Sequence, residues 1–535
     1  MTVPHAITYH NQTKYAPETI GNHPGLDWER QPIPYKLYDS LTPVALAPFL
    51  PFDPNPFTGK PRGPESELAT DGRVDLAVIS RWLFATYGIT GVIPNEARPT
   101  YLRAAPSAGG LYPAEIYLVV RELAGCEPGL YGYDPRRHHL VPLWNDAAVA
   151  GHLAAACYHD AAVAAAPVAL VVTGVFERSR WRYGERAYRR ILLDSGHLIG
   201  NACLMAPALG LRVHLTAAFC DGLFDEVLRI DPAEEGTLAV IALNAAGKVE
   251  RPHWSALPSG AAFDASPAAK IQDSDADADA DAAEADPSPL LHALHRASRL
   301  PHERPRVVGS GDAGEGLEAR YGWTSGASLV EDVPNREAAR WPLAQDPFQA
   351  ILRRRSTRRF QRGTMTRAQL ARILAAAYAP ETVGLGEQPS LDRGHLMTFV
   401  AVLAVEGFAP GVYYLAPHGL ELRLVRPGCD PETVQYLCLG QELGGDATAV
   451  VFHTADLADA VRAYGDRAYR YLHLDAGMIG ERLDLAAISE GCGASGIGGF
   501  FDDQVTDLLG IPREQAVVYI TTLGLPAQSP PSADG

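Results

Sequence analysis

The stretch YGERAYR at residues 183–189 recurs as YGDRAYR at residues 464–470, and this repeat decides the fold class. The offset is 464 − 183 = 281 residues, and Asp194 recurs as Asp475 at the same offset. A period of this size is that of a domain and is far longer than the repeats of solenoid proteins. The chain of 535 residues is therefore expected to contain two copies of one domain.

The pattern of apolar residues around the first repeat indicates an α+β domain. Residues 74–88 have helical spacing, residues 116–120 and 238–243 favour strands, and residues 186–211 have the pattern of a long helix. Helices and strands in this order are typical of the α+β class. Because a duplicated domain commonly packs around a pseudo-two-fold axis, we expect the two copies to form an intramolecular pseudo-dimer.

Alternating Asp and Ala at residues 273–286 mark a linker between the copies. A segment rich in charge and poor in large apolar residues does not repay the entropy of ordering, so we expect it to be disordered. The first residues are rich in Pro, Gly and Asn, which favours an extended arm. The expected organisation is an N-terminal arm at 1–70, a first domain at 71–252, an acidic disordered linker at 253–290, a connecting segment at 291–344 and a second domain at 345–530.

The composition excludes several classes of partner. The net charge is −17, which is unfavourable for binding nucleic acid or anionic membranes. The seven cysteines have neither metal-ligand nor disulfide spacing, and no secretory signal is visible, so we expect a cytoplasmic protein. His138 and His139 have no partner at metal-ligand spacing and are expected in an exposed turn, so no metal site is predicted.

An arginine cluster lies near the start of the second copy. Arg354, Arg355, Ser356 and Arg358 place three guanidinium groups and a hydroxyl within five residues. Guanidinium groups donate paired hydrogen bonds to phosphate, so the cluster favours a phosphate site. A basic helix end in solvent is the alternative interpretation.

Two glycine-rich segments are further candidates for binding a flat ligand. Residues 106–113 read PSAGGLYP, and residues 493–500 read GASGIGGF. Glycines allow the backbone to come close to a ligand. A tight turn into a strand and an ordinary glycine-rich connection are the alternative interpretations of these two segments.

Together these motifs resemble the nitroreductase family, and in particular its SagB/ThcOx-type dehydrogenases. The resemblance implies a mainly antiparallel sheet flanked by helices in each copy, with FMN as the cofactor. It implies that the arginine cluster holds the FMN phosphate, that the PSAGG turn lies against the flavin ring as a contribution from the other subunit of a dimer, and that the GIGG segment donates N–H to flavin N5. The implied cofactor-binding residues are Arg354, Arg355, Ser356, Arg358, Pro106, Ser107, Ala108, Gly110, Tyr112, Gly498 and Gly499.

The motifs are divided between the copies. At the offset of 281, residues 496–499 (GIGG) correspond to residues 215–218 (LTAA), and the arginine cluster is also missing from the first copy. In the second copy, Pro389 and Ser390 are followed by LDRGHLMT instead of AGGLYP. Of the two sites that a dimer of this family would have, one keeps all its parts and the other has lost all of them. We therefore expect one FMN per chain.

Arg182 and Tyr183 are the candidate catalytic residues, because they align with a Lys-Tyr pair of the azoline oxidases in this family. Arg does not deprotonate readily, whereas Tyr183 is able to donate a proton; a helix-end ion pair with a packed Tyr is the alternative. The resemblance implies hydride transfer between FMN and a small heterocyclic or peptide-derived substrate. The alternatives are an NAD(P)H-dependent reductase of nitro or quinone compounds and a non-catalytic scaffold of a biosynthetic complex.

Overall fold

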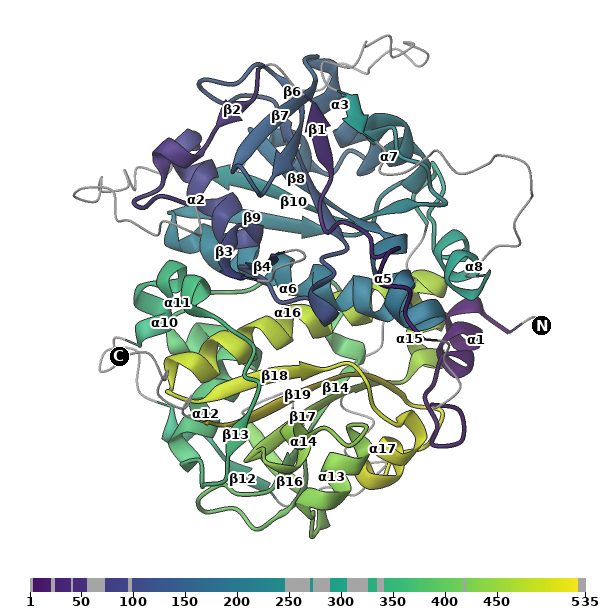
Figure 1. Ribbon diagram of the computed structural model, residues 1–535, viewed down its shortest axis with the longest axis vertical. Coiled ribbons are helices and arrows are strands. Elements are labelled where there is room, and N and C mark those ends of the chain that lie inside the picture. The colour runs from purple at the N-terminus through teal and green to yellow at the C-terminus, as the bar shows by residue number, and fades with distance from the viewer. Residues whose placement is uncertain are drawn as a thin grey trace. The chain divides into compact units, whose positions relative to one another are not determined.

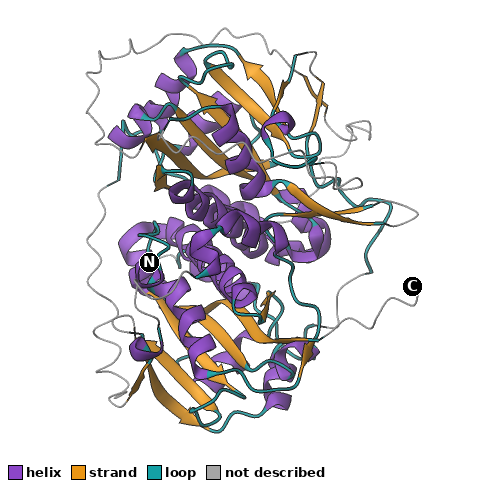
Figure 2. Ribbon diagram, turned by 90° about the vertical axis from the view of Figure 1, so that its left-hand side faces the viewer, coloured by secondary structure: helices purple, strands orange, loops and turns teal. Residues whose placement is uncertain are grey.

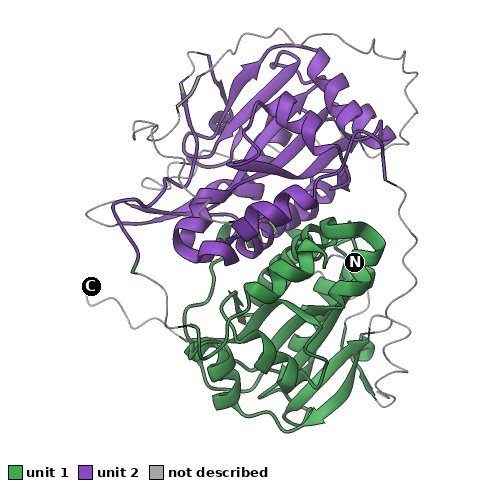
Figure 3. Ribbon diagram, turned by 90° about the vertical axis from the view of Figure 1, so that its right-hand side faces the viewer, with its two compact units in different colours: residues 1–25, 307–535 green, residues 26–306 purple. Residues whose placement is uncertain are grey.

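The computed structural model divides the chain into two compact units, coloured separately in Figure 3. Unit 1 contains residues 1–25 and 307–535, and unit 2 contains residues 26–306. The structure describes residues 3–20, 25–39, 42–54, 73–94, 99–245, 270–272, 289–305, 326–333, 341–416 and 420–527.

Unit 2 is built on a seven-stranded sheet in the order β2-β7-β6-β5-β8-β10-β9, with every neighbouring pair antiparallel. The apolar runs at residues 116–120 and 238–243 predicted two of its central strands, and the observed strands are buried along almost their full length. The strands are β2 (Val44–Ala45), β5 (Ala114–Val120), β6 (Gly129–Asp134), β7 (His139–Trp144), β8 (Val168–Val175), β9 (Leu211–Thr216) and β10 (Glu235–Ala245). Two smaller antiparallel pairs join β3 (Ile89–Ile93) to β4 (Thr100–Arg103) and β1 (Leu37–Asp39) to β11 (Lys270–Gln272).

Unit 1 repeats this topology. Its sheet has the order β12-β16-β15-β14-β17-β19-β13, and β18 pairs with β19 as β9 pairs with β10 in unit 2. All its pairs are antiparallel. The strands are β12 (Gly326–Ser328), β13 (Phe360–Gln361), β14 (Leu396–Val402), β15 (Gly411–Ala416), β16 (Glu421–Pro427), β17 (Ala449–Ala455), β18 (Gly493–Ile497) and β19 (Ala516–Pro526).

Helices flank the sheet in each unit, as Figure 2 shows, and they too recur in the same order. The long helix predicted at residues 186–211 is α6 (Ala187–Ala208), and its counterpart is α16 (Ala468–Ser489). The other helices of unit 2 are α2 (Leu76–Tyr87), α3 (Ala148–Ala156), α4 (Ala161–Ala165), α5 (Phe176–Tyr183), α7 (Asp221–Leu228) and α8 (Pro289–Ala297). Those of unit 1 are α1 (His5–Gln12), α10 (Pro342–Gln345), α11 (Pro347–Arg353), α12 (Arg367–Tyr378), α13 (Pro431–Leu437), α14 (Glu442–Gly445), α15 (Leu457–Tyr464) and α17 (Asp502–Leu509).

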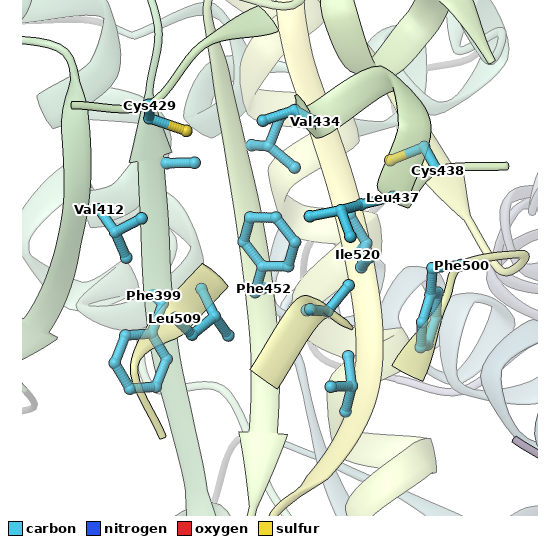
Figure 4. Close-up of a cluster of buried hydrophobic side chains, with 14 of the residues drawn as sticks. Phe399, Val412, Cys429, Val434, Leu437, Cys438, Phe452, Phe500, Leu509 and Ile520 are labelled. Atoms are coloured by element: carbon cyan, nitrogen blue, oxygen red, sulfur yellow. The ribbon is translucent and has the colours of Figure 1, made fainter. Parts of the chain in front are cut away.

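Apolar packing between sheet and helices holds the second copy together. Phe399 and Phe452 project from neighbouring strands of the sheet toward Val434 of α13 and Leu509 of α17 (Figure 4). Each of these side chains is almost fully buried, and burying one such residue stabilises the fold by about 1.5–3 kcal/mol. The helices α12 and α16 pack against each other, and α16 also packs on β18 and β19. The predicted α+β class and tandem duplication are confirmed, whereas the pseudo-dimer remains a prediction.

The two units have exchanged their N-terminal helices. Helix α1 precedes the first copy in the sequence but belongs to unit 1, and α8 precedes the second copy but belongs to unit 2 (Figure 3). In unit 1 the acid of the repeated motif, Asp466, accepts a hydrogen bond from Ala6 N at 2.7 Å. In unit 2 the equivalent acid, Glu185, accepts one from Leu291 N at 2.9 Å.

Further equivalent contacts dock these helices. The hydroxyl of Tyr469 lies 3.4 Å from His10 Nδ1, and that of the equivalent Tyr188 lies 3.1 Å from His295 Nδ1. Asp502 and Asp221, at the offset 502 − 221 = 281, each accept a backbone amide from the segment that follows the helix: Tyr15 N at 2.9 Å and Leu300 N at 2.8 Å. The repeated YG(E/D)RAYR motif therefore binds the helix that precedes the other copy.

Three expectations from the sequence need correction. Residues 5–12, expected within an extended arm at 1–70, form helix α1. Strand β11 lies inside the segment 253–290 that was expected to be disordered, because its backbone pairs with β1; residues 273–286, on which that expectation rested, lie outside the described residues. His138 is buried instead of exposed, because its two ring nitrogens lie 2.9 Å from Ser80 Oγ and 2.9 Å from the Tyr133 hydroxyl.

Candidate functional site

The predicted phosphate clamp, residues 354–358, connects α11 to β13 and lies along β18. The amide of Thr357 donates to Ala494 O at 2.8 Å. A Cβ at Gly493 would lie 2.2 Å from Thr357 Oγ1, so glycine is required there for the two segments to approach. Unit 1 therefore brings the arginine cluster beside the strand that leads into Gly498 and Gly499.

The arginines of the clamp differ in exposure. Arg355 and Arg358 are exposed and Ser356 is partly exposed, and Nη1 of Arg355 donates to the carbonyls of Leu352 and Arg354 at 3.1 and 2.7 Å. Arg354 is buried, with its Nε 3.8 Å from Glu481 Oε1 on α16. Burial raises the pKa of nearby Asp484 to about 6, an effect that the charge of Arg354 opposes. Arg354 thus anchors the clamp to α16, whereas Arg355 and Arg358 face solvent.

The glycine-rich segment 493–500 is part strand and part loop. Residues 493–497 form β18, and residues 498–500 form the loop that follows it. Gly496 has a packing role, because a Cβ there would lie 1.8 Å from the hydroxyl of Tyr519. The strand registers place Leu215 and Ala239 at the equivalent positions of unit 2. The small residue therefore lies on β18 and the large one on β19 in unit 1, whereas in unit 2 the large residue lies on β9 and the small one on β10.

This exchange of sizes predicts a coupled mutational effect. Gly496→Leu should destabilise the chain by about 1–3 kcal/mol because it overfills the space beside Tyr519. Adding Tyr519→Ala recreates the Leu-Ala pair of unit 2 and should restore most of the lost stability. Thermal unfolding of the wild type, both single variants and the double variant measures the coupling. Additive losses in the double variant would contradict this explanation of Gly496.

The PSAGG turn of unit 2 is held by Asp194 of α6. Ser107 Oγ donates to Asp194 Oδ2 at 2.5 Å, and Ala108 N lies 3.1 and 3.2 Å from the two carboxylate oxygens. Ser107 Oγ also accepts the amide of Tyr112 at 2.8 Å. In unit 1 the equivalent Asp475 accepts a hydrogen bond from the amide of Leu391 at 2.8 Å. Both copies therefore use this aspartate of the long helix to hold the segment that corresponds to the turn.

The turn borders the candidate catalytic pair. Gly109 has φ +67°, and a Cβ there would lie 3.0 Å from the hydroxyl of Tyr183 and 3.1 Å from Cδ of Arg182. The guanidinium carbons of Arg182 and Arg190 lie 5.8 and 5.1 Å from the centroid of the Tyr183 ring. Unit 2 therefore brings together the predicted turn, Arg182 and Tyr183.

Comparison with known proteins identifies the family. The family model described as "Nitroreductase family" matches the chain twice, over residues 69–246 and 351–525. The chain belongs to the nitroreductase family. The predicted resemblance is thereby confirmed, and the family is one of oxidoreductases. A protein of Methanocaldococcus jannaschii named as a nitroreductase is 38% identical over 155 residues, which are 29% of this chain and 74% of that protein.

Two other relatives of this nitroreductase-family chain are named for peptide processing. The trifolitoxin-processing protein TfxB of Rhizobium leguminosarum bv. trifolii is 31% identical over 176 residues, and the microcin B17-processing protein McbC of Escherichia coli is 26% identical over 151 residues. The matches cover 32% and 28% of this chain. They span about half the length of these relatives, 47% and 54% respectively.

One solved structure matches nearly the whole chain. The crystal structure of a protein from Anabaena variabilis, described as a nitroreductase, has a TM-score of 0.81 and 38% sequence identity. The match covers 98% of this chain and 100% of that one. The tandem arrangement of two nitroreductase domains is therefore found in another protein of the family.

The predicted site residues of this nitroreductase-family chain form two groups. Unit 1 brings Arg354, Arg355, Ser356 and Arg358 near the strand before Gly498 and Gly499, and unit 2 brings the residues of the turn near Arg182 and Tyr183. The joining of both groups around one cofactor remains a prediction. Within the described residues, no helix is both long enough and apolar enough to cross a membrane.

The sequence identifies Asp194 only as part of the repeat and assigns no role to Arg190. The structure connects both to the turn, because Asp194 holds Ser107 and Arg190 lies beside Tyr183. A comparison of the copies offers the missing signal for Arg190. At the offset of 281 it corresponds to Tyr471, so a charge is present at this position in the first copy alone.

Asp194 should produce a measurable pH dependence. Burial raises its pKa from 3.8 to about 7, an effect that the hydrogen bonds from Ser107 and Ala108 and the charge of Arg190 oppose. A carboxyl whose pKa is higher in the folded state favours folding at low pH, and this contribution is lost as the pH rises to the folded pKa. Between about pH 4 and pH 7, the free energy of unfolding of the wild type should fall by about 4 kcal/mol relative to that of Asp194→Asn.

The test of this pH dependence compares thermal unfolding midpoints of the wild type and Asp194→Asn across that range. Asn keeps an acceptor for the amide of Ala108 but does not titrate there. The difference between the two midpoints should change between about pH 4 and pH 7 and become constant above it. Parallel profiles for the two proteins throughout the range would contradict the raised pKa.

Proposed function

We propose that this chain is an FMN-dependent oxidoreductase with one flavin site per chain. The observation that carries the proposal is the bond from Thr357 N to Ala494 O, which fixes the arginine cluster beside the strand leading to Gly498 and Gly499. Unit 1 thus supplies both the proposed phosphate clamp and the glycine backbone that would lie along the ring of the same cofactor. The first copy has neither the arginine cluster nor the glycines of the GIGG segment at the corresponding positions.

The donors present fit a flavin mononucleotide. Arg355, Ser356 and Arg358 would hold the phosphate, because guanidinium and hydroxyl groups match its oxygens, and Arg354 would support them from its position on α16. The backbone at Gly498 and Gly499 would lie along the ring. A bound flavin supplies hydride transfer to or from its N5.

The turn of unit 2 would complete the ring-binding surface. Asp194 accepts hydrogen bonds from Ser107 and Ala108 of the turn, and Gly109 leaves the space that the Tyr183 hydroxyl borders. The turn residues proposed to contact the ring are Pro106, Ser107, Ala108, Gly110 and Tyr112. The hydroxyl of Tyr183 would donate or accept the proton that accompanies hydride transfer. Arg182 would place a positive charge beside it.

For the substrate, we propose a small heterocyclic or peptide-derived molecule. The similarity to the trifolitoxin- and microcin B17-processing proteins supports this class. We also propose a cytoplasmic location, which the seven free thiols support because such thiols are typical of a reducing compartment.

Flavin stoichiometry tests the cofactor. The purified chain, loaded with excess FMN and freed of unbound ligand, should retain about one FMN per chain, the number that one phosphate clamp predicts. Two per chain would contradict the division of the site between the copies. A chain that takes up no FMN would favour the non-catalytic scaffold.

Anaerobic mixing distinguishes the two redox functions. Rapid bleaching of the bound flavin by NADPH would favour the alternative, a reductase of nitro or quinone compounds. Bleaching by a thiazoline-containing peptide, with none by NADPH, is the result expected for the proposed dehydrogenase.

A further inference from the structure

Arg190 is a buried cation beside the candidate catalytic tyrosine. Only 4% of its surface is exposed, and its guanidinium carbon lies 5.1 Å from the centroid of the Tyr183 ring. Asp194 lies one helical turn later, but its oxygens accept from Ser107 and Ala108. Burying a guanidinium costs free energy that an anion offsets, so this position suits an anionic group.

A second cation and a phenol lie at the same place. Arg182 is exposed, and both guanidinium groups lie within 6 Å of the Tyr183 ring centroid, at 5.8 Å for Arg182 and 5.1 Å for Arg190. A Cβ at Gly109 would lie 3.0 Å from the Tyr183 hydroxyl and 3.1 Å from Cδ of Arg182, so both side chains border the turn. Two guanidinium groups and a hydroxyl therefore gather at the edge of the candidate site.

The second copy shows that packing of the tyrosine does not require these charges. Tyr464 is the equivalent of Tyr183, and at the same offset Ala463 and Tyr471 replace Arg182 and Arg190. The ring of Tyr471 packs edge-to-face on Tyr464 with the centroids 5.4 Å apart. The same backbone is thus compatible with an uncharged environment, and the two arginines belong to the copy that keeps the PSAGG turn.

We propose that Arg182, Arg190 and Tyr183 form a subsite for the carboxylate of the substrate. This inference rests on the proposed function in treating Tyr183 as part of the substrate site. Guanidinium binds carboxylate through paired, charge-assisted hydrogen bonds, and the phenol adds a third donor. The substrate class is an amino-acid-derived or peptide-derived acid whose carboxylate lies close to a flat reacting ring.

Calorimetric titration of the full chain with benzoate and with benzamide tests the subsite. The two probes share a flat ring and differ in charge. Benzoate should bind at least about tenfold more tightly than benzamide, and Arg190→Met should remove this preference, because a charge-assisted bond is worth about tenfold or more in affinity. Arg180→Met is the matched control: it removes the same charge from α5, where Arg180 pairs with Glu177, and should bind benzoate as the wild type does.

Equal binding of benzoate and benzamide by the wild type would overturn the subsite, and so would unchanged benzoate binding by Arg190→Met. If Arg190→Met fails to fold, the exposed Arg182→Met replaces it, with the same expected loss of at least about tenfold and the same overturning result. Arg190→Lys, which keeps the charge, should retain part of the preference. The titration is made with and without FMN, so a failure of the subsite is distinguishable from a failure to bind flavin.

Discussion

The double variant Arg354→Ala, Arg358→Ala should be purified without flavin. Arg358→Ala removes a charge-assisted bond to the phosphate, which contributes about 1.5–3 kcal/mol, and Arg354→Ala removes the buried support of the clamp, so together they weaken FMN binding by at least about 10–10²-fold. The effect is measured as flavin absorbance per chain after gel filtration and as the Kd of the apoprotein for FMN. Binding within threefold of the wild type would contradict the proposed clamp.

Two further variants separate phosphate binding from folding. Arg354 is buried beside Glu481, so its removal leaves a carboxylate without its charge partner. The pair Arg355→Ala, Arg358→Ala changes exposed side chains alone and should also release FMN. Arg362→Ala, whose side chain is 85% exposed, removes a nearby charge that pairs with Asp446 and should keep the flavin.

Replacing Tyr183 with Phe should abolish most turnover while flavin remains bound. The hydroxyl at the Gly109 turn is the proposed proton donor or acceptor, and such a group contributes about 10²–10⁴-fold to a rate. The measurement is the rate of flavin bleaching in an anaerobic stopped-flow experiment, with whichever of NADPH or a thiazoline-containing peptide reduces the wild type.

The duplication supplies the control for this variant. Tyr464 is the equivalent residue in the copy that lacks the PSAGG turn, and it packs against Tyr471 in a similar way. Tyr464→Phe should therefore leave the bleaching rate near that of the wild type. Equal losses in both variants would indicate a structural role for the tyrosine instead of a chemical one.

Much of the fold was predictable because the pattern is regular and occurs twice. The long helix expected at residues 186–211 is observed at Ala187–Ala208, and the strand expected at 116–120 lies within Ala114–Val120. Helix α1 was not predicted, because its eight residues depend on tertiary contacts such as the bond from Ala6 N to Asp466. Short helices have little stability of their own, so local sequence is a weak guide to them.

The candidate site was predictable as motifs but not as geometry. The sequence placed Ser107 in a turn, yet the carboxylate that holds it, Asp194, is 87 residues away. Gly496 belongs to the GIGG segment, and the space that it leaves for the Tyr519 hydroxyl was not evident from the motif. Both contacts depend on strand register and helix packing, which residue spacing alone does not define.

The exchange of α1 and α8 has a consequence for biosynthesis. Helix α1 (His5–Gln12) is translated long before the residues that dock it, because Ala6 and its partner Asp466 are 460 residues apart and Tyr469 follows Asp466. At ordinary elongation rates of about 5–20 residues per second, it waits on the order of half a minute or more for them. Helix α8, in contrast, emerges after Glu185 and Tyr188 and is able to dock at once. The first copy therefore receives its docked helix soon after it is translated, whereas α1 stays undocked until the YGDRAYR motif of the second copy has been made.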